Sequence, residues 1–155
     1  MDKTNAMRQL DRKKISYKVH EYEGAVSGTD VAAALGETPE TVYNTLVTRG
    51  KSGEHYVFMI PVAEELDLKK GAKAVGEKSI AMLPQKELLP LTGYIHGGCS
   101  PIGMKKQFPT VIQAGAMDFD TVFFSGGKVG LQIESSPHTL EKLMRIQEAD
   151  VTVNK

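Results

Sequence analysis

The segment TGYIHGGCSPIGMKK, residues 92–106, contains four glycines and one proline between two more apolar stretches of the chain. Glycine weakens a helix or a strand because it loses the most conformational freedom on folding, and Pro101 has no N–H to donate to either. The segment therefore predicts a shaped loop, which limits how the flanking stretches can continue. Two interpretations are open: the loop is an ordinary turn, or its bare backbone lets a ligand approach the N–H groups of Gly97 and Gly98.

Hydrophobic periodicity on both sides of this loop predicts short helices interleaved with short strands. Helices are predicted at residues 4–14, 29–35, 68–76 and 84–89, and a last amphipathic helix is predicted to begin at Ser136 and Pro137, with Leu140, Leu143 and Met144 facing inward. Ser27 followed by Asp30 resembles a capping box before the second helix, and Asp67 is the expected cap of the third. Strands are predicted at residues 15–22, 79–83, 110–114, 121–125, 129–134 and 150–153, and residues 41–50 and 55–61 predict a β-hairpin.

These elements do not alternate strictly between strand and helix. The sequence therefore predicts an α/β fold with a mixed, strongly curved, barrel-like β-sheet surrounded by helices. At 155 residues the chain is expected to form a single domain, residues 1–155. It contains no apolar run near the roughly 20 residues that a membrane helix needs. Because its N-terminus also lacks the apolar centre of a secretory signal, the expected location is the cytoplasm, with no membrane partner.

Charge and cysteine content exclude several kinds of function. Nineteen basic and nineteen acidic residues give a formal net charge of zero, which argues against holding long nucleic acid by bulk electrostatics but permits a short end in a local pocket. One cysteine cannot form an internal disulfide, and together with four histidines it shows no metal-ligand spacing, so no metal or other cofactor is predicted. Cys99 is either a nucleophile or, as is more common, a small loop residue.

Three polar clusters stand apart from the core pattern: residues 97–103, the SGGK of residues 125–128, and the end of a hairpin strand around Tyr43 and Asn44. Each alone has an ordinary explanation. SGGK between two strands is by default a hairpin turn, and it is not a Walker loop because the G-x-x-x-x-G-K-[ST] pattern is not met. His20 and Tyr22 are by default strand residues that face water.

Taken together and in this order, the motifs resemble the YbaK/EbsC family of aminoacyl-tRNA deacylases, which is related to the editing domain of bacterial prolyl-tRNA synthetases. The segments that carry the resemblance are HEYEG (20–24), VYNTLV (42–47), LDLKKGAKAVG (66–76), TGYIHGGCSPIGMKK (92–106) and VFFSGGKVGLQIE (122–134). The resemblance covers about the whole chain. It implies the fold of that editing domain and hydrolysis of misacylated tRNA, above all Cys-tRNA(Pro) and also Cys-tRNA(Cys).

The resemblance also implies roles for individual residues. Backbone N–H groups of Gly97 and Gly98 would stabilise the negative charge that ester cleavage builds on the carbonyl oxygen. The cysteine thiol of the substrate would attack its own ester, so the protein would only position the groups and Cys99 would be a bystander. The resemblance implies that Tyr22, Tyr94 and Ser125 surround the aminoacyl and adenosine groups. The further residues expected to bind the substrate are Ser100, Lys128 and Gln132.

Asn44 departs from the family pattern. Relatives carry a lysine in the motif V-[YF]-K-T-L, thought to hold a phosphate at the tRNA end, whereas this chain has VYNTL and lacks that charge. Three explanations are open: a natural substitution for which a cation such as Lys105 or Lys128 compensates, an engineered change that inactivates the site, or a catalytically silent aminoacyl-tRNA-binding or regulatory module. A separate alternative is a deacylase for another small amino acid, as in Ala-tRNA(Pro). Gln132 also replaces an aspartate of some relatives. Because the net charge predicts weak tRNA binding, prolyl-tRNA synthetase is a candidate partner.

Overall fold

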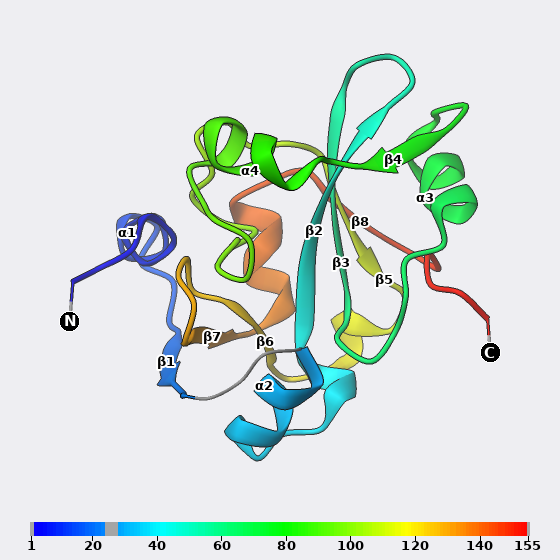
Figure 1. Cartoon of the computed structure of the whole chain (residues 1–155). Coiled ribbons are helices and arrows are strands. Elements are labelled where there is room, and N and C mark those ends of the chain that lie inside the picture. Colours follow the sequence, from blue (N-terminus) through cyan, green and yellow to red (C-terminus); the bar gives the residue numbers. More distant parts are fainter. Residues whose placement is uncertain (1, 24–27, 155) are drawn as a thin grey trace.

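The structure, a computed structural model, describes residues 2–23 and 28–154 and contains two β-sheets (Figure 1). The smaller sheet is antiparallel, in the order β1 (Lys18–Glu21), β7 (Leu131–Ser135), β6 (Val122–Ser125). The larger sheet has the order β4 (Ile80–Met82), β2 (Tyr43–Gly50), β3 (His55–Pro61), β5 (Thr110–Gln113), β8 (Ile146–Ala149). Its pairing is antiparallel from β4 to β3 and parallel from β3 to β8, which confirms the predicted mixed α/β fold.

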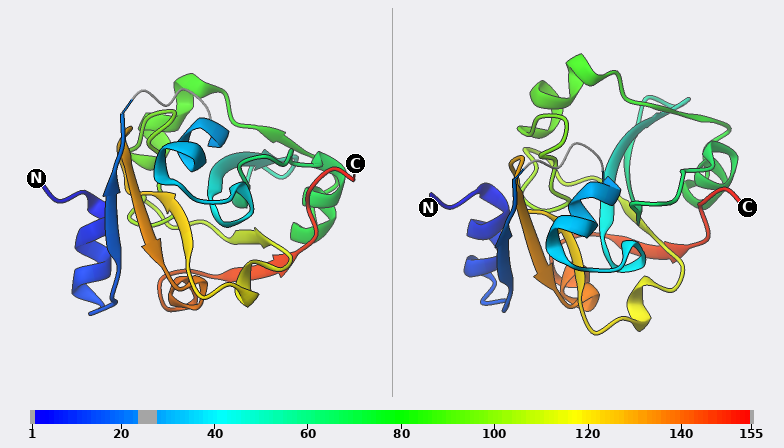
Figure 2. Two further views of the ribbon diagram at one scale, coloured as in Figure 1. Left: turned by 90° about the horizontal axis from the view of Figure 1, so that it is seen from below. Right: turned by 60° about the horizontal axis from the view of Figure 1, so that its bottom comes forward.

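Helices lie at both ends and across the middle of the molecule (Figure 2). They are α1 (Asn5–Arg12), α2 (Gly28–Leu35), α3 (Leu68–Val75) and α4 (Gln85–Thr92), with 3-10 turns η1 (Pro39–Thr41), η2 (Ala116–Asp118) and η3 (Pro137–Lys142). Asp67 caps α3 as predicted, because its carboxylate accepts from the backbone N–H groups of Lys69 and Lys70. Ser27, half of the predicted capping box, lies outside the described residues. No helix in the described ranges is both long and apolar enough to cross a bilayer.

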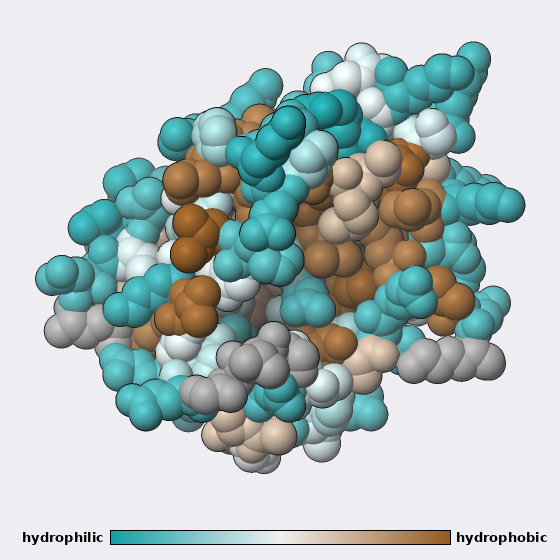
Figure 3. Space-filling model, in the orientation of Figure 1, coloured by the Kyte–Doolittle hydropathy of each residue, from teal (hydrophilic) through white to brown (hydrophobic). Residues whose placement is uncertain are grey.

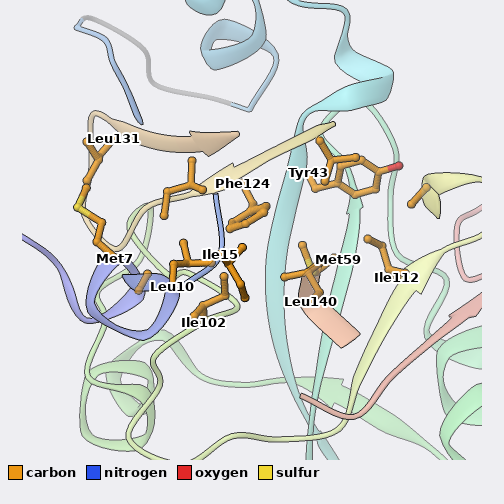
Figure 4. Packing of buried hydrophobic residues seen from close by; sticks show 14 residues of the cluster. Met7, Leu10, Ile15, Tyr43, Met59, Ile102, Ile112, Phe124, Leu131 and Leu140 are labelled. Atoms are coloured by element: carbon orange, nitrogen blue, oxygen red, sulfur yellow. The ribbon is translucent and has the colours of Figure 1, made fainter. Parts of the chain in front are cut away.

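The main core fills the space between α1, the inner face of the smaller sheet and the larger sheet (Figure 4). Side chains alternate across a strand, so Leu131 and Ile133 of β7 and Phe124 of β6 point into this core and are fully buried. Met7 and Leu10 of α1 close it from the other side. The opposite face of the smaller sheet is consequently left to carry polar residues.

The two sheets meet at one isolated bridge, a parallel pairing of Val42 with Phe123. Both side chains are buried with Ala32 of α2 in a small apolar cluster separate from the main core. The sheets do not close into a barrel. The barrel-like part of the predicted fold is therefore limited to this contact between the two sheets. The junction fixes how the smaller sheet stands relative to β2.

The predicted C-terminal helix was wrong, although Leu140, Leu143 and Met144 pack into or against the main core as expected. Ser136 caps a turn, but the turn is the short 3-10 element η3, and no α-helix follows it up to residue 154. The chain instead forms β8, which pairs in parallel with β5. The strand predicted at residues 150–153 is reduced to a single bridge between Thr152 and Leu66.

Candidate functional site

A cavity of about 670 Å³ lies where the smaller sheet, β2, α4 and the glycine loop (residues 93–106) meet. Figure 3 shows this face of the molecule, with apolar side chains on both sides of a central hollow. Within the described part of the chain, no Asp, Glu, Lys or Arg lines the cavity. Its polar wall comes from Tyr22, Tyr43, Asn44, Thr45, Gln85, His96, Cys99, Ser125 and Gln132.

The smaller sheet supplies one polar wall. Gln132 of β7 pairs with His20 of β1 on one side and with Ser125 of β6 on the other, so the three side chains share the face opposite the main core. Ser125 Oγ accepts from the Gly127 N–H at 3.2 Å, which holds the following turn against it. Gln132 is only 6% exposed, and no described residue is a hydrogen-bond partner of its Oε1. An unpaired, buried carboxamide oxygen is therefore part of the wall.

The second polar wall is an open edge of β2. The bonds from Val62 N to Val42 O and from Gly50 N to Glu54 O direct the main-chain groups of even-numbered residues towards β3. Those of Thr45 therefore point to the other side of β2. β4 pairs only with residues 48–50, and β6 bridges β2 at Val42, so no described strand pairs with Thr45 there. The Thr45 hydroxyl oxygen is also buried, and no described residue is its hydrogen-bond partner.

Asn44 lies on the opposite face of β2 from Thr45, at the end of the cavity next to α2. A Cβ placed on Gly28 would come within 3.2 Å of Asn44 Oδ1 and 2.7 Å of Val62 Cβ, so α2 begins in close contact with this position. Position 44 thus lines the cavity, as the family motif implies, but with an uncharged side chain.

Of the two amides expected to face the substrate, the structure leaves that of Gly97 free and that of Gly98 bonded. Gly97 has a φ of +85° and lines the cavity, and among the described residues its N–H donates to no protein acceptor. The N–H of Gly98 is already bonded to the Ile95 carbonyl at 3.0 Å. This corrects the expectation for Gly98, whose amide closes a turn. A Cβ on Gly98 would lie 2.9 Å from Lys128 Cα, so this glycine is needed for loop packing instead.

Three of the expected substrate-binding residues lie away from the cavity wall. The Tyr94 hydroxyl donates to the Ile102 carbonyl at 2.7 Å inside the protein, where burial raises the pKa of Tyr94. Ser100 is fully buried, and its Oγ accepts from the Ile102 N–H at 3.3 Å. Lys128 is exposed beside Gly98. Tyr94 and Ser100 therefore shape the glycine loop from behind.

Cys99 lines the cavity but lacks the properties of a nucleophile. It is 7% exposed, and burial raises the pKa of its thiol to about 12. The thiol therefore stays protonated at neutral pH, when a reactive cysteine would need to be a thiolate. His96 lines the same cavity on the exposed part of the loop.

Sequence reasoning missed Thr45 and the apolar residues of the wall. The one sequence signal that could have indicated Thr45 is its place next to Asn44 in the family motif. The apolar lining comes from separate elements, from Val31 of α2 to Leu88 of α4, and resembles ordinary core residues in the sequence.

Comparison with known proteins identifies the fold to which this cavity belongs. A family described as the aminoacyl-tRNA editing domain matches residues 23–143. The chain belongs to this family. This editing domain is 45% identical over 156 residues to a protein of Enterococcus faecalis provisionally named Cys-tRNA(Pro)/Cys-tRNA(Cys) deacylase EbsC, covering 99% of the chain and 95% of that protein.

Two solved structures share the fold of this editing domain. One is described, again provisionally, as a trans-editing enzyme for prolyl-tRNA synthetase, with a TM-score of 0.84 at 24% identity over 99% of this chain and all of that one. The other is described only as a hypothetical protein, with a TM-score of 0.88 at 20% identity over 97% of this chain and all of that one. The expected YbaK/EbsC-type fold is confirmed.

Proposed function

We propose that this aminoacyl-tRNA editing domain hydrolyses the ester bond of misacylated tRNA, with Cys-tRNA(Pro) as its main substrate and Cys-tRNA(Cys) as a second. The observation that carries the proposal is the uncharged cavity with the free amide of Gly97 in its wall. An ester carbonyl placed there gains a hydrogen-bond donor that strengthens as the oxygen becomes negative. The 45% identity to EbsC supports cysteine as the amino acid.

The reaction needs no nucleophile from the protein. The substrate thiol forms a bond to the ester carbon as the bond from that carbon to the ribose oxygen breaks, and the thiol proton ends on the released ribose hydroxyl. Water then opens the resulting cyclic thioester, breaking its carbon–sulfur bond, so that free cysteine is the final product. Holding sulfur and carbon in contact contributes up to about 7–11 kcal/mol in well-oriented intramolecular reactions. The protonated Cys99 thiol and the absence of carboxylates from the described cavity wall fit this substrate-assisted route.

Two other functions are alternatives. A neutral amide at position 44 holds a phosphate less strongly than lysine does, because charge-assisted hydrogen bonds are about twice as strong as neutral ones. Asn44 therefore favours a silent module that binds aminoacyl-tRNA without cleaving it. Independently of Asn44, the chain could deacylate another small amino acid, such as alanine in Ala-tRNA(Pro). Lys128, exposed beside the glycine loop, and Lys105, exposed on that loop, are the cations that could compensate.

The experiment that tests the proposal is a deacylation assay with purified protein. Cys-tRNA(Pro), Cys-tRNA(Cys) and Ala-tRNA(Pro) are incubated separately, and release of the amino acid is followed. We expect the cysteinyl esters to be cleaved and the alanyl ester to persist, because alanine has no thiol. Cleavage of Ala-tRNA(Pro) alone would favour the second deacylase, and cleavage of none would favour the silent module.

Asn44→Lys is the companion variant. If Asn44 limits the enzyme, the lysine should raise kcat/KM by about tenfold, mostly through KM, since it adds one charged contact to phosphate. An unchanged rate would indicate that another cation already supplies the contact.

Prolyl-tRNA synthetase is the partner we propose. A net charge of zero gives the chain little sequence-independent affinity for the phosphate backbone. We expect binding of tRNA(Pro) at physiological salt to tighten at least tenfold when the synthetase is added. Equally tight binding by the chain alone would contradict this partnership.

A further inference from the structure

Two buried side-chain oxygens in the cavity wall have no hydrogen-bond partner among the described residues. They are Gln132 Oε1, from the central strand of the smaller sheet, and Thr45 Oγ1, from β2. Buried polar groups in folded proteins are nearly always paired, and leaving one unpaired costs about 1–3 kcal/mol. Unpaired groups gathered at one cavity indicate that a ligand supplies the missing partners.

Both walls of the cavity offer hydrogen-bond acceptors. Thr45 offers its hydroxyl, which can also donate, and its main-chain carbonyl, which points away from β3 where no described strand pairs with β2. Gln132 offers its Oε1. Rotating the carboxamide by half a turn exchanges Oε1 with Nε2, and no described residue accepts a hydrogen bond from Nε2 either. Acceptors of this kind match a group that carries several N–H donors and no acceptor.

We propose that Gln132 and Thr45 bind the α-amino group of the aminoacyl substrate. This inference rests on the proposed function, because the aminoacyl ester carries one such group, its α-ammonium, with three donors. Since the described cavity wall contains no carboxylate, recognition depends on neutral oxygens. The α-amino group then lies between β7 and β2, and the ester carbonyl reaches Gly97 on the glycine loop.

The test is a binding measurement that requires no catalysis. The probes are 3′-cysteinylamino-3′-deoxyadenosine, whose amide resists cleavage, and its 3-mercaptopropionyl counterpart, which lacks only the α-amino group. Their Kd values are measured by calorimetry for the unmodified protein and for Gln132→Leu, Gln132→Glu and Thr45→Val. The unmodified protein should bind the amino probe about 10–100 times more tightly, as expected for hydrogen bonds to a charged group.

Gln132→Leu should remove most of this preference, whereas Gln132→Glu should keep it because a carboxylate is an acceptor at both oxygens. Thr45→Val should reduce the preference several-fold. Neither Gln132→Leu nor Thr45→Val should lower the melting temperature, because each removes an unpaired buried group. If Gln132 and Thr45 served only to stabilise the fold, these variants would instead lower the melting temperature and leave the preference for the amino probe unchanged.

Thr48→Val is the matched control on the same strand. Thr48 is fully buried, but its hydroxyl donates to the Tyr56 carbonyl at 3.2 Å and it does not line the cavity. This variant should lose stability and keep the probe preference. Equal binding of the two probes, no measurable binding of either, or a Gln132→Glu variant as impaired as Gln132→Leu would overturn the inference. The deacylation assay tests the proposed function separately, since an inactive protein can still discriminate the probes.

Discussion

At Gly97 the main chain has a φ of +85°, which an alanine adopts only at a cost of roughly 1–2 kcal/mol. Space is not the obstacle, because a Cβ there would meet only Val129 Cγ2, at 3.4 Å. We expect Gly97→Ala to lower turnover of Cys-tRNA(Pro) by a factor of tens or more, because backbone strain moves the free amide away from the ester carbonyl. Single-turnover deacylation measures this loss.

Gly115→Ala is the control for strain alone. Gly115 has a φ of +97°, a Cβ on it would meet no atom of another described residue within 4 Å, and it does not line the cavity. The two variants should lose similar amounts of stability in urea unfolding, while only Gly97→Ala loses activity. Equal activities would remove the Gly97 amide from the mechanism.

The Cys99 thiol gives a second prediction at this scale. Because its pKa is raised to about 12, Cys99→Ala should retain deacylation within about threefold. A loss of a hundredfold or more would identify Cys99 as the nucleophile after all. Slow reaction of the folded protein with iodoacetamide at pH 8 is the accompanying chemical check.

The same shift predicts a pH dependence of stability. The thiol titrates near 9.0 when exposed and near 12 when folded, so between these values the folded state holds a proton that the unfolded state has lost. The free energy of unfolding therefore falls as pH rises, by up to about 1.4 kcal/mol per pH unit. Urea unfolding from pH 8 to 11 should show a shallower fall for Cys99→Ala. If the free energy of unfolding fell equally with pH in both proteins, the result would contradict the raised pKa of Cys99.

At the scale of elements, the glycine loop and the turn at residues 126–130 are held in contact at Gly98. A Cβ there would lie 2.9 Å from Lys128 Cα and 3.0 Å from Val129 N, which are backbone atoms and cannot rotate away. Gly98→Ala should therefore force the two loops apart, with a loss of about 1–3 kcal/mol and of most activity. Urea unfolding and the deacylation assay measure the two effects, and a fully active, equally stable variant would refute the contact.

Elements with local signals were predictable from the sequence, and elements that depend on distant partners were not. The hairpin of β2 and β3 and the cap of α3 follow from neighbouring residues. The strand β8 has only half-buried Ile146 and Ala149 between polar residues, so its pattern is weak. It is a strand because β5, more than thirty residues away along the chain, supplies parallel hydrogen bonds.

The same distinction applies to the site. The sequence motifs located the glycine loop and Asn44, but they could not tell which loop side chains turn inward. Tyr94 was expected at the substrate because it is polar and lies near Gly97, whereas its hydroxyl satisfies a carbonyl of the loop itself. Thr45 was missed because its open edge depends on where β4 stops pairing with β2.

At the scale of the whole molecule, the cavity depends on how the two sheets are placed. One wall belongs to the smaller sheet, the other to β2, and Val42 and Phe123 join them. Two walls that must hold one ester between them tolerate little displacement, since a 1 Å error in position can cost about a hundredfold in rate. Substitutions at the junction of Val42 and Phe123 should therefore lower activity more than the small size of this apolar cluster suggests.

Phe123 and Phe124 allow this to be tested, because they are adjacent on β6 and point to opposite faces. Phe123 is 2% exposed at the sheet junction, and Phe124 is fully buried in the main core. Phe123→Leu and Phe124→Leu should each cost about 1–2 kcal/mol of stability, as a moderate loss of buried volume does. At a temperature where both are folded, Phe123→Leu should lower kcat/KM for Cys-tRNA(Pro) by about tenfold or more, while Phe124→Leu changes it less than threefold. Equal activities at equal stability would mean that the junction does not position the cavity walls.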